Sequence, residues 1–142
     1  MFLEEKGPFV LSVFSFIDTV SEVKKGESLT AFFTLKPGEE YLKDHFMDFP
    51  VMPGVLQLEA LKQAASRFLN ETEGTAESYR LETARSVKYG QFIKPGTRLK
   101  IFVRFLKKEG RSSHFEGRMD RVEEDRLAGR SILANFSLVP VS

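Results

Sequence analysis

The stretch DHFMDFPVMPGVLQLE, residues 44–59, decides the fold and points to the chemistry. It places His45, one of the chain's two histidines, fourteen residues before Glu59. Between them, Pro53 and Gly54 open a strongly apolar helical segment. A histidine, a carboxylate and the start of a helix are the groups that proton transfer on a carbonyl compound requires. The stretch therefore predicts an acid–base site at the N-terminus of a helix.

The segment after Pro53 is predicted to be a helix over residues 54–69. Turned by about 100° per residue, its apolar residues fall on one arc. These residues are Val55, Leu58, Leu61, Ala65, Phe68 and Leu69. Glu59 and Gln63, which are spaced i,i+4, lie together at the edge of that arc. We therefore expect both polar side chains to lie near the buried face of the helix and not opposite it.

Strand patterns lie on both sides of the predicted helix. They cover residues 8–23, 28–35, 80–89, 99–107, 114–122 and 127–139. Turn signals rich in Gly, Pro and charged residues separate several of them. The order predicts an α+β fold, in which a long central helix is wrapped by a curved antiparallel sheet of about six strands. A single sheet of this size leaves a face or an edge to cover, which favours oligomerisation.

Composition narrows the class of protein. We expect one domain over residues 1–142, because 42% of the residues are hydrophobic, which is enough for a core. A net charge of +1 gives no strong field for nucleic acid or a membrane surface, and the absence of cysteine excludes disulfides and thiolate chemistry. No apolar run approaches about 18 residues, and residues 1–6 lack the pattern of a signal peptide. We therefore expect a cytoplasmic protein.

The helix start and its flanks resemble the active-site motif of the 3-hydroxyacyl-acyl-carrier-protein dehydratases of fatty acid synthesis, which have the hot-dog fold. The matching residues are His45-Phe46, Pro50-Val51-Met52-Pro53-Gly54-Val55-Leu56, Glu59-Ala60-Leu61 and Gln63. The resemblance extends to Phe14-Ser15-Phe16-Ile17-Asp18 and to Ile93-Lys94-Pro95-Gly96. Element order and length also agree, so the resemblance covers roughly the whole chain.

This resemblance implies a role for each matching residue. His45 would remove the C2 proton of a 3-hydroxyacyl thioester, and Glu59 would protonate the departing hydroxyl. The Gly54 N–H would hold the thioester oxygen, with Val55 next to it in the substrate site, and Gln63 would orient Glu59. No metal, nucleotide or flavin is implied.

The resemblance also implies partners. The substrate would be carried on acyl carrier protein or be another acyl thioester. In the family, the His and Glu of each site come from different subunits, so a homodimer is the smallest active unit, and a trimer of dimers is a larger form. A basic stretch of six residues is either a solvated strand face or a patch for an acidic carrier protein. It consists of Arg98, Lys100, Arg104, Lys107, Lys108 and Arg111.

Two other functions remain open at this point. Asp44, Met47 and Asp48 stand where the family has small or rigid residues beside its histidine. A hot-dog thioesterase would use a carboxylate to activate water at the carbonyl, and a non-catalytic hot-dog protein would only bind acyl chains or a partner. An Asp-His-Asp metal site around His45 is the least favoured interpretation.

Overall fold

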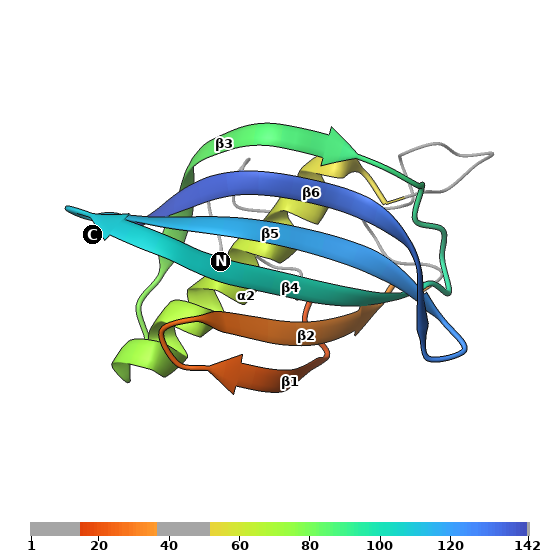
Figure 1. Ribbon diagram of the computed structural model, residues 1–142, viewed down its shortest axis with the longest axis horizontal. Coiled ribbons are helices and arrows are strands. Elements are labelled where there is room, and N and C mark those ends of the chain that lie inside the picture. Colours follow the sequence, from red (N-terminus) through yellow and green to blue (C-terminus); the bar gives the residue numbers. More distant parts are fainter. Residues whose placement is uncertain (1–14, 37–51, 142) are drawn as a thin grey trace, which may run out of the picture.

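The computed structural model describes residues 15–36 and 52–141, and these form one sheet and one long helix (Figure 1). The elements in chain order are β1 Thr19–Lys24, β2 Ser28–Thr34, α2 Gly54–Glu73, β3 Tyr79–Tyr89, β4 Arg98–Glu109, β5 Ser112–Glu123 and β6 Arg126–Pro140. The sheet order is β1-β2-β4-β5-β6-β3, and all neighbours are antiparallel. The predicted α+β arrangement is confirmed.

The sheet curves around α2, which lies across its concave side (Figure 1). The helix contacts β2, β3, β4, β5 and β6. Side chains alternate between the two faces of the sheet along β6. Every second residue therefore faces the helix and is buried, namely Ile132, Ala134, Phe136 and Leu138.

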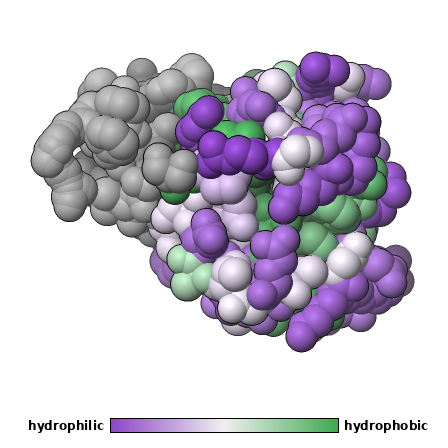
Figure 2. Space-filling model, turned by 90° about the vertical axis from the view of Figure 1, so that its left-hand side faces the viewer, coloured by the Kyte–Doolittle hydropathy of each residue, from purple (hydrophilic) through white to green (hydrophobic). Residues whose placement is uncertain are grey.

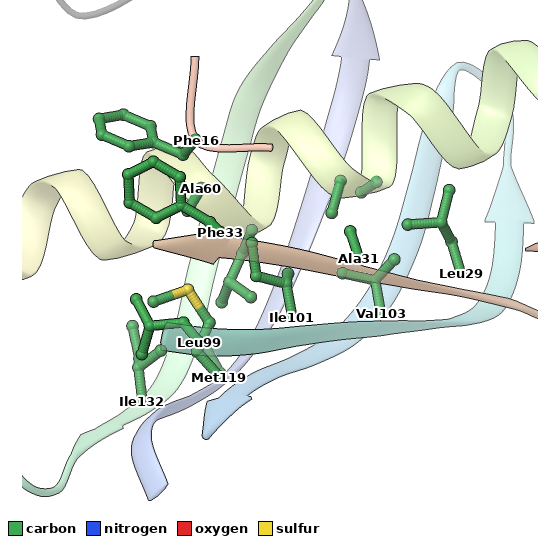
Figure 3. Packing of buried hydrophobic residues seen from close by; sticks show 14 of the residues in the cluster. Phe16, Leu29, Ala31, Phe33, Ala60, Leu99, Ile101, Val103, Met119 and Ile132 are labelled. Carbon is green, nitrogen blue, oxygen red and sulfur yellow. The ribbon is translucent and has the colours of Figure 1, made fainter. Parts of the chain in front are cut away.

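Aromatic rings fill much of the space between helix and sheet. Phe16 and Phe33 meet edge to face beside Ala60, with ring centroids 5.5 Å apart (Figure 3). Further along the helix, the Phe68 ring stacks on Phe105 and meets Phe115 edge to face. The contacts of Phe68 therefore hold the C-terminal half of α2 against the sheet.

The helix start agrees with the prediction, and its end lies further along the chain. Pro53 is the N-cap residue, and α2 ends at the C-cap Gly74, whose φ of 68° is left-handed. The N–H groups of Gly74 and Thr75 both donate to the Asn70 carbonyl. Polar residues 70–73 therefore continue the helix to the first glycine that can close it, beyond the predicted end at residue 69.

Two predictions about burial and bounds need correction. Val55 is 58% exposed, so it does not belong to the buried arc that the periodicity predicts. The buried stripe runs through Leu56, Gln57, Ala60, Leu61, Ala64, Ala65, Phe68 and Leu69. The predicted arc omitted the two small alanines at 60 and 64, which rotated its centre away from the true one. The first strand begins only at Thr19, and residues 8–14 of the predicted strand lie outside the described residues.

Within the ranges that the structure describes, no helix is both long enough and apolar enough to cross a membrane.

Candidate active site at the start of the long helix

The first turn of α2 presents backbone N–H groups without a side-chain cap. The Leu56 and Gln57 N–H groups both donate to the Pro53 carbonyl, at 3.0 and 3.2 Å. The N–H groups of Gly54 and Val55 lie before any possible i−4 acceptor within the helix. No acidic residue occupies this first turn, so the turn itself supplies no carboxylate to offset the positive end of the helix dipole. This end of α2 can therefore receive a developing negative charge on an oxygen.

The Tyr89 ring lies against Gly54. A Cβ atom placed on Gly54 would be 2.7 Å from Tyr89 Cζ, so a glycine is needed for this approach. Tyr89 is half exposed, and its partial burial raises the pKa of its phenol above 10.0. Tyr89 is distant from Gly54 in sequence, and the two meet only through the packing of β3 against α2.

Glu59 is held at the edge of the buried face, as its position in the sequence predicts. Its side chain is 10% exposed. Gln63 Nε2 donates to Glu59 Oε2 at 3.0 Å, and Gln63 Oε1 accepts the Phe16 N–H at 2.8 Å. The backbone donor fixes which end of the Gln63 amide faces Glu59. The structure thus brings Glu59 and Gln63 together in the arrangement that would orient the carboxylate.

Lys62, which lies outside the sequence motif, also contacts Glu59. Lys62 Nζ lies 3.2 Å from Glu59 Oε2, and the Lys62 side chain is 19% exposed. The i,i+3 spacing of the two residues was the available signal, because it places them as neighbours on the helix surface. A lysine on a helix is more commonly solvated, so this spacing alone does not indicate a site residue.

Of the remaining predicted site residues, the structure describes Gly54 and Val55 but not His45. Gly54 and Val55 form the first turn, five and four residues before Glu59, which places Glu59 about 6–7.5 Å further along the helix axis. His45 lies outside the described residues, as do Asp44, Met47 and Asp48. Among the residues that are described, no group of three His, Asp or Glu side chains could hold a metal ion.

The basic stretch on β4 and the β4–β5 turn is partly paired within the chain. Arg104 bonds Glu116 at 2.8 Å, Lys107 lies 3.4 Å from Glu109, and Arg98 stacks over the Phe32 ring. Figure 2 faces the end of the molecule that holds the β4–β5 turn, where hydrophilic side chains surround a strip of hydrophobic ones. These internal contacts fit a solvated strand face, and a carrier patch stays a prediction.

A helix wrapped by one curved antiparallel sheet, with a carboxylate on its inner edge, is the architecture of the hot-dog proteins. The protein family described as ApeI-like, ApeI dehydratase, matches residues 21–128, and the chain belongs to this family. The resemblance to hot-dog dehydratases is therefore confirmed.

Individual relatives agree with this family. The chain is 38% identical over 95 residues to the 3-hydroxyacyl-acyl-carrier-protein dehydratase FabZ of Pediococcus pentosaceus, a match that covers 66% of this chain and 64% of that protein. The match thus spans just under two thirds of that relative's length. The enzyme of the same name from Coxiella burnetii is 32% identical over 136 residues, covering 93% of this chain and 91% of its own.

A solved structure shows the same fold. The dehydratase heterocomplex ApeI:P from Xenorhabdus doucetiae contains a chain that superposes with a TM-score of 0.72 at 16% identity. The superposition covers 97% of this chain and 87% of that chain. The predicted hot-dog fold is confirmed.

Proposed function

We propose that the protein is a hydro-lyase that converts 3-hydroxyacyl thioesters into trans-2-enoyl thioesters. The observation that carries the proposal is the Glu59 carboxylate, which is 10% exposed and bonded by Gln63, on a helix whose N-cap residue, Pro53, provides no side-chain cap. Membership of the ApeI-like dehydratase family supports the same reaction. The catalytic residues in this proposal are His45 and Glu59, and Gly54, Val55 and Gln63 bind or orient.

The reaction needs a base, an acid and a site for negative charge. His45 takes the C2 proton, and the electrons of that C–H bond form the C2–C3 double bond. The C3–O bond breaks, and the Glu59 carboxyl gives its proton to the departing hydroxyl, which leaves as water. During the step, the Gly54 N–H at the helix start stabilises the charge that develops on the thioester oxygen.

The proposed substrate is an acyl chain on acyl carrier protein, in fatty acid synthesis or a related lipid or polyketide pathway. FabZ relatives carry the acyl carrier protein in their names, which supports this carrier. We further propose a cytoplasmic homodimer in which His45 of one subunit faces Glu59 of the other. This arrangement follows from the family resemblance.

An assay that starts separately from the substrate and from the product of the reaction tests the proposal. The protein is incubated with a 3-hydroxyacyl carrier-protein thioester and, separately, with the enoyl thioester, while double-bond formation and thiol release are followed. We expect interconversion of the two thioesters and no thiol release. His45→Ala and Glu59→Gln should each slow the interconversion at least about a hundredfold, whereas His114→Ala, which alters the other histidine, should not. Thiol release would indicate a thioesterase, and binding without turnover an acyl-binding protein.

A further inference from the structure

The ion pair between Lys62 and Glu59 differs from an ordinary surface pair. Its side chains are 19% and 10% exposed, whereas those of Arg67 and Glu71, an ion pair on the same helix, are 51% and 46% exposed. An ammonium and a carboxylate that are enclosed together lose hydration that an exposed pair keeps. The burial of the Lys62–Glu59 pair therefore indicates a role other than the weak stabilisation that exposed ion pairs on helices provide.

Two donors meet on one oxygen of the Glu59 carboxylate. Lys62 Nζ lies 3.2 Å and Gln63 Nε2 lies 3.0 Å from Oε2. Gln63 is itself fixed, because its Oε1 accepts the Phe16 N–H at 2.8 Å. Donors from two directions set the orientation of the carboxylate plane, and Oε1 is then the oxygen that can carry a transferable proton.

We propose that Lys62 is a positioning residue of the dehydratase site, an inference that rests on the proposed function. With Gln63, its ammonium holds Oε2 of Glu59 so that Oε1 faces the departing hydroxyl. In the dehydration direction, Glu59 enters the step protonated on Oε1, and this proton moves to the hydroxyl oxygen as the C3–O bond breaks and water leaves. The ion pair of Lys62 and Glu59 is the state that follows this step. Lys62 then lies beside the carboxylate that remains and offsets its new negative charge. Lys62 transfers no proton itself.

Substitutions at Lys62 give the first test. Lys62→Met keeps the aliphatic stem and removes the ammonium, so we expect kcat to fall at least about tenfold while KM changes less than about threefold. Lys62→Arg keeps a cation and should retain more of kcat than Lys62→Gln. The matched control is Arg67→Met, which removes the exposed ion pair of the same helix and should leave kcat unchanged.

A double-mutant cycle shows whether Lys62 acts through Glu59. In the Glu59→Gln background, Lys62→Met should change the residual kcat less than about twofold, because the group that it positions is already gone. Wild-type kcat in Lys62→Met, or an equal loss in both backgrounds, would overturn the inference and leave the proposed function standing. Failure of the wild-type protein to release water would instead refute the proposed function.

Stability is measured for each variant by thermal unfolding. If Lys62→Met unfolds below the assay temperature, the comparison of Lys62→Arg with Lys62→Gln decides. Equal kcat values in these two variants would overturn the inference.

Discussion

At the scale of single residues, the site depends on one amide that bonds in two directions. Gln63 accepts the Phe16 N–H and donates to Glu59, so it links the segment before β1 to the helix edge. The i,i+4 spacing of Glu59 and Gln63 made this contact predictable from sequence. The role of Phe16 was not predictable, because it comes from a segment 47 residues away in the chain.

Replacing Gln63 with Leu should therefore lower both stability and activity. The change removes the acceptor of the Phe16 N–H and a donor of Glu59, each in a partly buried setting. We expect the free energy of unfolding to fall by about 2 kcal/mol, measured by denaturant unfolding. An exposed change on the same helix, Arg67→Gln, should cost less than about 0.5 kcal/mol. Equal stability of the two variants would contradict the bonding described for Gln63.

At the scale of elements, the periodicity of apolar residues predicted the helix and its first residue, but not the exposure of Val55 or the last turn of the helix. Five of the six strands were predicted to within a few residues because turn signals bound them, whereas the first, predicted from residue 8, is β1 from Thr19 within the described residues. Lys62 and Tyr89 were missed for different reasons. Lys62 looks like a solvated helix residue, and Tyr89 reaches Gly54 only through the packing of β3 against α2.

Glu82 joins three strands at one end of the sheet. It lies on β3, and its Oε1 accepts hydrogen bonds from Ser112 of β5 at 2.7 Å and Ser137 of β6 at 2.9 Å. These two bonds, led by that of Ser112, hold the pKa of Glu82 below its usual 4.5. The contribution of this group to stability is therefore present above about pH 4.5 and is lost as the pH falls through the lower pKa of the folded state.

Ser112→Ala should raise the pKa of Glu82 towards 4.5, because the strongest of its hydrogen bonds disappears. The side-chain carboxyl resonance of Glu82, followed by NMR between acid and neutral pH, measures this shift directly. Lys88→Ala on the same strand serves as a control and should leave the titration in place. A Glu82 that titrates at 4.5 in the unmodified protein would contradict the bonding to the two serines.

At the scale of the whole molecule, the described chain leaves β1 and β3 at the two edges of one sheet. Edge strands carry unpaired backbone groups that a second chain can use. The proposed homodimer goes further, because it assigns the two catalytic residues of each site to different subunits.

Mixing two inactive variants tests this division. His45→Ala and Glu59→Gln, unfolded and refolded together, should form heterodimers in which one site contains both native residues. With random pairing, the mixture should regain about a quarter of wild-type activity. Each variant refolded alone should stay inactive. If the two catalytic residues of a site belong to the same subunit, the mixture stays inactive as well, and the division between subunits is wrong.

The most direct test of the central claim is the hydration of a trans-2-enoyl thioester in D2O. If His45 and Glu59 act as proposed, the wild-type protein forms the 3-hydroxyacyl thioester with deuterium at C2, and mass spectrometry detects the label. The Glu59→Gln protein should form this product at least about a hundredfold more slowly. Labelling at the wild-type rate by Glu59→Gln, or release of free thiol without any label at C2, would contradict the account.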